Sequence, residues 1–127
     1  MKQRFSLWGL IFLTIMMCAQ GVKAQDYTVD GITYTLSNGE WSVIGCSETL
    51  VDALIKESID GHPVTSIGEK AFYQIETLKN VLIPETVTKI GKRAFRGCTL
   101  LSNITLPESI THLDDYAFYN CGNNGLL

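Results

Sequence analysis

Histidine is scarce in this 127-residue chain, and the common catalytic motifs are missing from it. The two histidines, His62 and His112, have no cysteine or carboxylate partner at the spacing of metal ligands. The sequence contains no G-x-S-x-G, no H-E-x-x-H and no phosphate-binding glycine loop. Asp114 and Asp115 are adjacent in a predicted turn, which favours the start of a helical segment over an acid–base pair. We therefore expect no enzymatic activity, no metal site and no cofactor.

Long hydrophobic runs are also scarce, and the one that stands out, Phe5–Cys18, follows two basic residues near the amino terminus. It is too short for a comfortable membrane span and typical of the core of a signal peptide. Small side chains before a possible cleavage point predict that residues 1–24 are a signal peptide removed after Ala24. The alternatives are a lipoprotein signal at Cys18, which the bulky Met17 disfavours, and an uncleaved anchor.

Positive charge is limited as well. The chain has 10 basic and 13 acidic residues, and residues 1–24 contain three of the basic residues and no acid. The predicted mature chain therefore has seven basic and 13 acidic residues and a net charge of −6. This balance argues against non-specific binding to nucleic acid or to anionic membranes. What remains after cleavage is enough for one domain with a modest core.

What the sequence does contain is a repeat with a period of 23 residues, in segments that begin at Val64, Val87 and Ile110. A period in the low twenties indicates a solenoid, in which each repeat forms one coil and neighbouring coils bury each other's apolar face. The positions in phase are Ile67, Ile90 and Leu113; Ala71, Ala94 and Ala117; Phe72, Phe95 and Phe118; Leu78 and Leu101; Val81 and Ile104; Ile83 and Leu106; Pro84 and Pro107.

Each repeat predicts two short strands and a turn. Leu78, Val81 and Ile83 form an L-x-x-L-x-L pattern that ends in an alternating strand, and Pro84 closes it. A second extended piece follows at Val87–Ile90, and a glycine then permits a tight turn. An Ala-Phe pair after that glycine predicts about one turn of α-helix or 3-10 helix. The expected fold class is therefore α/β, a solenoid of 23-residue coils with short strands and short helical turns, in which the phenylalanines stack.

These motifs resemble a known family. The pattern V-T-x-I-G-x-x-A-F-x-x-C followed by L-x-x-I-x-L-P is similar to BspA-like leucine-rich repeats, and the repeats cover about half of the chain. The resemblance implies a leucine-rich repeat solenoid and no shared catalytic residues. It also implies a secreted or surface-attached protein, similar to adhesins of anaerobic gut and oral bacteria and of some protozoa.

The segment before the repeats predicts a β-hairpin. Ile32–Leu36 and Trp41–Ile44 alternate as strands do, and Asn38-Gly39 lies between them. We expect residues 25–45 to form a hairpin that caps the first coil. A ligand site on this hairpin is the less favoured alternative.

The solenoid is expected to span residues 46–127, with an irregular first coil near Cys46. Leu50, Ala53 and Ile55 repeat the strand pattern five residues too early, and Asp60–Pro63 marks the inserted turn. After Cys121 the last coil lacks its strand, which predicts a solenoid truncated at its C-terminus. We expect self-association of the chain through that open coil.

Three cysteines remain after the predicted cleavage, so at least one thiol is unpaired. Cys98 and Cys121 are one period apart and should stack at strand spacing, which permits a disulfide. Stacked side chains point the same way, however, so a buried column of free thiols is the favoured interpretation.

The candidate binding face is the row of outward positions along the predicted sheet, where a solenoid can bind an extended partner. The alternative is that these residues are ordinary solvent-facing side chains. A small basic cluster, Lys89, Lys92, Arg93 and Arg96, does not continue along the solenoid, which favours a solvated face. The row comprises Val51, Asp52 and Leu54, and the six candidate site residues Lys79, Asn80, Leu82, Ser102, Asn103 and Thr105.

Two functions are consistent with the sequence. The first is a secreted or cell-surface interaction module that binds a host or bacterial surface protein or a glycan through the sheet face, as an adhesin does. The second is a truncated structural fragment of a larger surface repeat protein, with no ligand of its own. The signal peptide and hairpin favour the first, and the incomplete last coil favours the second.

Overall fold

The structure is a computed structural model that describes residues 25–122. The predicted signal peptide, its cleavage point and the predicted truncated end lie outside the described residues. The proposed domain boundaries therefore stay predictions.

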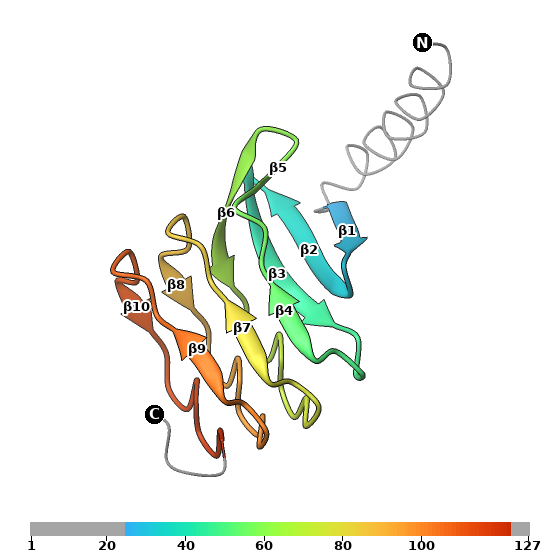
Figure 1. Ribbon diagram of the computed structural model, residues 1–127. Coiled ribbons are helices and arrows are strands. Elements are labelled where there is room, and N and C mark those ends of the chain that lie inside the picture. Colours follow the sequence, from blue (N-terminus) through green and yellow to red (C-terminus); the bar gives the residue numbers. More distant parts are fainter. Residues whose placement is uncertain (1–24, 123–127) are drawn as a thin grey trace.

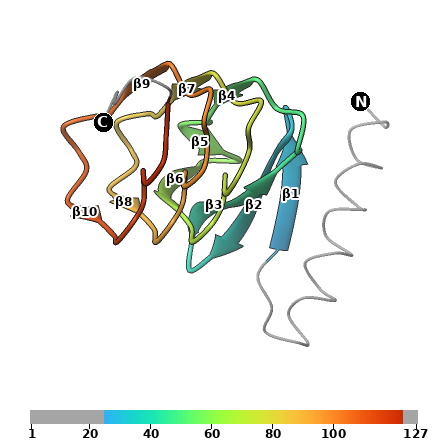
Figure 2. The same cartoon turned by 90° about the horizontal axis from the view of Figure 1, so that it is seen from below.

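Ten β-strands wind into a solenoid with two sheets (Figure 1). A seven-stranded sheet has the order β1-β2-β3-β6-β8-β10 with β5 paired to β6, and a three-stranded sheet has the order β4-β7-β9. Figure 2 shows the two sheets on opposite sides of each coil. The strands are β1 (Gln25–Val29), β2 (Ile32–Ser37), β3 (Glu40–Cys46), β4 (Asp52–Leu54), β5 (Ser58–Ile59), β6 (His62–Ile67), β7 (Asn80–Leu82), β8 (Lys89–Ile90), β9 (Asn103–Thr105) and β10 (His112–Leu113).

The 23-residue period sets the register between coils. Val81 pairs with Ile104 in the three-stranded sheet, and Ile67 pairs with Ile90 in the other, both in parallel. Residues one period apart therefore lie side by side, and each apolar position of the repeat becomes a column through the core. The solenoid prediction is confirmed.

The predicted helical turns and the α/β class are wrong. No helix occurs in residues 25–122, so none there could cross a membrane. The segments expected to be helical, 69–74, 92–97 and 115–120, are successions of tight turns, which we call the turn edge. Lys70 and Gln74 both have a φ of 57°, and this left-handed backbone interrupts a right-handed helix.

Hydrogen bonding explains why turns replace helix. The N–H of Phe72 donates to the carbonyl of Ala94 at 2.7 Å, and the N–H of Phe95 donates to that of Ala117 at 2.8 Å. These N–H groups donate to the next coil. They therefore cannot donate to the carbonyl four residues earlier in the chain, which an α-helix would require. The molecule is therefore a β-solenoid whose third side is a ladder of turns.

The phenylalanine column forms the centre of the core. Phe72 and Phe95 are fully buried, and their rings stack at 4.9 Å with an interplanar angle of 3°. Phe95 and Phe118 stack at 5.1 Å and 4°. The predicted ladder is confirmed. Phe118, in the last described coil, is only partly buried.

The amino-terminal segment forms the expected antiparallel pair β2–β3, joined at Asn38-Gly39. Its inward side chains Ile32 and Tyr34 are fully buried, and the Tyr34 hydroxyl accepts a hydrogen bond from the Lys56 N–H at 3.1 Å. β3 then pairs in parallel with β6, so the hairpin continues the sheet of the solenoid. β1, which pairs with β2, was not predicted.

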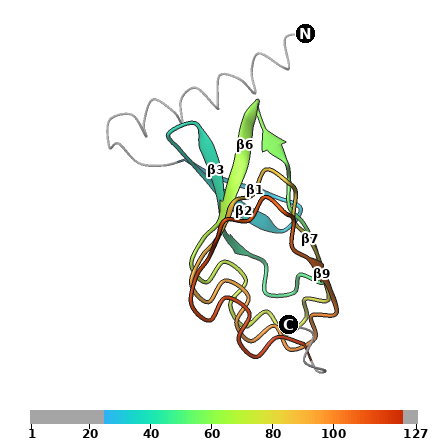
Figure 3. The ribbon, with the colours of Figure 1, turned by 90° about the vertical axis from the view of Figure 1, so that its left-hand side faces the viewer.

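The inserted turn after the first coil is a second small hairpin. β5 pairs with β6 across Asp60 and Gly61, both at positive φ. The indole N–H of Trp41 donates to the Ile59 carbonyl at 3.0 Å and ties this hairpin to β3. In Figure 3, β3 and β6 extend beyond the outline of the stacked coils.

Among the described residues the three cysteines are free thiols, with Cys98 and Cys121 buried. The Cys98 thiol donates to the Phe72 carbonyl at 3.0 Å, and the Cys121 thiol donates to the Phe95 carbonyl at 2.7 Å. The predicted column of buried thiols is therefore confirmed. The neighbouring Cys121 thiol and burial raise the pKa of Cys98 above its usual value.

Candidate binding face on the β4-β7-β9 sheet

The three-stranded sheet presents alternate residues to solvent. Ala53 and Val81 point into the core and are buried, because side chains alternate between the two faces of a strand. The residues on either side of them point outward and form two columns across the coils. The first column is Asp52, Asn80 and Asn103, and the second is Leu54, Leu82 and Thr105.

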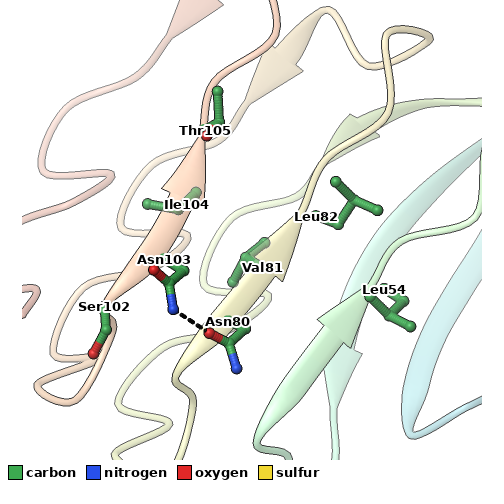
Figure 4. Close-up of a pocket in the computed structure, with 8 residues that line it drawn as sticks. All are labelled: Leu54, Asn80, Val81, Leu82, Ser102, Asn103, Ile104 and Thr105. Carbon is green, nitrogen blue, oxygen red and sulfur yellow. Dashed lines mark hydrogen bonds between the residues drawn. The ribbon is translucent and has the colours of Figure 1, made fainter.

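The first column is a continuous hydrogen-bonded ladder. The Asn80 side-chain amide donates to the Asp52 carboxylate at 2.5 Å. The Asn103 amide donates in turn to the Asn80 side-chain oxygen at 2.6 Å (Figure 4). Asn80 and Asn103 are in register in the repeat, as predicted from the sequence, and the ladder extends to Asp52.

Asp52 sets the direction of this ladder. An ionised carboxylate can only accept hydrogen bonds, so Asn80 must turn its NH₂ group toward it. Its oxygen then faces Asn103, which must also present NH₂. Each amide keeps one N–H directed away from the ladder, and the Asn103 oxygen is unpaired in the described residues. The face therefore carries amide N–H donors of fixed orientation, one from each of two neighbouring coils.

The second column is apolar and unusually exposed. Leu54 is 58% exposed and Leu82 is 62% exposed. Together with Thr105, Asn80 and Asn103 they border an open depression of about 290 Å³ (Figure 4). A partner could place an apolar group against the exposed leucines. Oxygen atoms of the same partner could then accept hydrogen bonds from the neighbouring amides.

The structure brings five of the six candidate residues together around this depression. Asn80, Leu82, Asn103 and Thr105 form the two columns. Ser102 lies at its margin, and its hydroxyl donates to the Leu100 carbonyl at 2.8 Å. Lys79 is exposed just before β7 and does not border the depression.

The polar residues considered for chemistry do not converge. His62 Nδ1 lies 3.1 Å from the Gly39 carbonyl oxygen, and His112 Nδ1 lies 2.9 Å from the Thr111 hydroxyl. Asp114 and Asp115 are exposed at the start of a turn. Within residues 25–122, no three His, Cys, Asp or Glu side chains are grouped as metal ligands would be.

The coil pattern matches a described family of repeats. Residues 57–125 match the BspA type leucine rich repeat region, with six copies. The chain belongs to the BspA-type leucine-rich repeat family. This match confirms the resemblance found in the sequence, and members of the family are repeat proteins.

Solved structures of bacterial leucine-rich repeat proteins share this fold. A leucine-rich repeat protein of T. pallidum is 28% identical with a TM-score of 0.67, over 76% of this chain and 46% of that one. One from Bacteroides ovatus is 30% identical with a TM-score of 0.68, over 76% and 27%. One from Bacteroides capillosus is 27% identical with a TM-score of 0.67, over 79% and 88%. The chain thus spans less than half the length of the first two.

No similar protein was found among the curated proteins compared with this chain.

Proposed function

We propose that this BspA-type repeat protein is an interaction module that binds a protein or a glycan through the β4-β7-β9 face. The observation that carries the proposal is the pair of exposed leucines, Leu54 and Leu82, beside the Asp52–Asn80–Asn103 ladder. Solvent-facing strand positions are ordinarily polar, so two neighbouring leucines more than half exposed are typical of a contact surface. The ladder restricts the rotamers of its amides and so lowers the entropic cost of binding.

The proposed location is the cell surface or the exterior of the cell. It is supported by the signal-like sequence of residues 1–24 and by the family. A further relative by fold, 22% identical with a TM-score of 0.54, is described as a leucine rich cell surface protein of Faecalibacterium prausnitzii. The intact mass of secreted protein tests this location: we expect a chain that begins at Gln25, and a lipid-modified Cys18 would contradict the cleavage.

The test of binding uses an array of purified polysaccharides and purified secreted proteins. The variant Leu54→Asn/Leu82→Asn should bind its array partner at least tenfold more weakly than the natural chain, a loss of about 1.4 kcal/mol or more. Leu100→Asn is the matched control, because Leu100 is 41% exposed and does not border the depression.

The second candidate function is a structural element without a ligand. This candidate is motivated by coverage: the chain matches only 46% of the length of one solved relative and 27% of the length of another. If no array partner bound, or if the leucine variant and the Leu100 control lost equal affinity, the binding proposal would be rejected in favour of this structural role.

A further inference from the structure

The turn edge carries two columns made of tyrosines and cationic side chains. One period separates Lys70, Arg93 and Tyr116 in the first column, and Tyr73, Arg96 and Tyr119 in the second. The Arg96 guanidinium lies 5.2 Å from the centre of the Tyr119 ring. The Tyr116 and Tyr119 rings meet edge to face at 5.7 Å. These residues come from different coils, and the solenoid brings them together into one patch.

Within the described part of the chain, the cations of this patch have no ionic partner. Within residues 25–122, Lys56 and Asp30 form the single ion pair, at 2.8 Å and away from the turn edge. The Nε of Arg93 is buried and makes no hydrogen bond in the described structure. Such an unsatisfied donor is uncommon in folded proteins. Because neither arginine is paired with a carboxylate in residues 25–122, the guanidinium groups of Arg93 and Arg96 keep their charge available to a ligand, although the chain as a whole is acidic.

Nearby acidic residues limit where an anion can dock. Glu69 and Asp115 occupy the same position of the repeat as Lys92, one coil to either side, and Asp114 is adjacent. They offset the charge of Lys92 at the start of the turns. Arg96 and Tyr119 come later in their turns than these carboxylates do. This part of the turn edge therefore favours the binding of an anionic group.

Beside Arg93 and Arg96, the backbone of the turn edge offers little to a peptide strand. The N–H of Phe95 and that of Gly97 already donate to the next coil, at 2.8 and 3.0 Å. A partner that adds a strand needs unpaired backbone groups, so it would not fit here. The accessible chemistry is instead guanidinium groups and ring faces, and Tyr116 and Tyr119 are each 56% exposed.

We propose that the turn edge binds an acidic glycan, a chain of sugars bearing carboxylate or sulfate groups. Arg93 and Arg96 bind the anionic groups, because guanidinium pairs with carboxylate and sulfate oxygens through charge-assisted hydrogen bonds. The exposed faces of Tyr116 and Tyr119 pack against the apolar C–H faces of the sugar rings. This site is separate from the β4-β7-β9 face, so either can be present without the other.

The experiment measures binding of the secreted chain to dextran sulfate, carboxymethyl dextran and neutral dextran by biolayer interferometry. We expect binding to both charged polymers, none to neutral dextran, and weaker binding as salt rises. Arg96→Gln should weaken binding about tenfold, on the scale of one charge-assisted hydrogen bond. Tyr119→Ala removes a ring that packs on the sugar and should also weaken binding about tenfold. Lys56→Gln and Tyr27→Ala, which remove one cation and one tyrosine elsewhere on the surface, should alter binding less than about twofold.

Three results would overturn the proposal. The first is an equal loss for Arg96→Gln and Lys56→Gln, which would indicate attraction by overall charge. The second is full binding by Tyr119→Ala. The third is polyglutamate binding as tightly as carboxymethyl dextran, which would indicate an acidic peptide partner. If Arg96→Gln fails to fold, Arg96→Lys replaces it: the charge is kept, the planar fork is lost, and a loss of affinity is still expected.

Discussion

Phe95 occupies the middle of the stacked column and contacts a phenylalanine in each neighbouring coil. Phe95→Ala removes a fully buried ring from this column, so it should lower the free energy of unfolding by about 3–5 kcal/mol. Chemical denaturation of the natural and variant chains measures the loss. Phe95→Leu, which keeps most of the volume, is the control and should cost clearly less. A melting transition unchanged by the alanine variant would show that the column contributes little to stability.

The thiol of Cys46 tests burial at a single residue. Burial raises its pKa from 9.0 to about 11. The neutral thiol is therefore favoured in the folded state, and its contribution to stability is present below pH 9 and is lost as pH rises toward 11. Because the thiolate is the reactive form, alkylation of Cys46 should keep accelerating up to about pH 11 in the folded chain.

Mass spectrometry of the Cys46 peptide at short reaction times measures this profile. The same chain in denaturant is the control, and its alkylation rate should level off near pH 9, the usual value for the group. A folded profile that also levels off near pH 9 would show that the thiol is solvated.

At the scale of the coil, close contact between neighbours depends on glycine. A Cβ added at Gly91 would lie 2.7 Å from the Glu69 nitrogen and 2.9 Å from the Gly68 carbonyl carbon. Backbone atoms cannot move aside as a flexible side chain can, so the two coils would have to separate. Gly91→Ala should therefore destabilise the chain by about 1–3 kcal/mol.

Gly45→Ala is the matched control for this substitution. A Cβ at Gly45 meets no atom within 4 Å, so the variant should change stability by less than about 0.5 kcal/mol. Equal melting temperatures for the two variants would mean that the coils can separate at little cost.

For the whole molecule, the self-association predicted from the sequence would use the exposed side of the last described coil. There Leu113 is 52% exposed, and with Leu106 and Phe118 it borders an open hollow of about 440 Å³. An apolar patch beside a strand edge promotes pairing between chains. We expect the mature chain, which begins at Gln25, to form oligomers through this side, and light scattering at increasing concentration measures them.

A designed polar coil appended to the chain tests where the contact lies. It should yield a monomer with a higher melting temperature, because a polar outer coil covers the apolar side. Leu113→Asp should also reduce association, whereas the control Leu54→Asp, on another exposed leucine, should not. A natural chain that is monomeric at all concentrations tested would contradict the prediction.

The sequence by itself determined the solenoid, the core columns and the placement of the candidate face. A period of 23 residues puts equivalent positions in contact wherever one coil stacks on another, so Phe72, Phe95 and Phe118 had to meet once the chain coiled. The same period brings Asn80 and Asn103 into register. These conclusions depend only on the period and on the pattern of apolar residues, and both can be read directly from the amino-acid sequence.

Tertiary structure decided what depends on hydrogen bonds between coils. The Ala-Phe segments suit a helical turn locally, but the N–H of Phe95 donates to the carbonyl of Ala117 in the next coil, so the chain forms turns. The Asp52 carboxylate, 28 residues before Asn80, orients the amide ladder only because the inserted hairpin is accommodated outside the stacked coils. Arg96 and Tyr119 likewise meet only when the coils stack. Such contacts join residues of different coils, and their geometry is set only when the solenoid has formed.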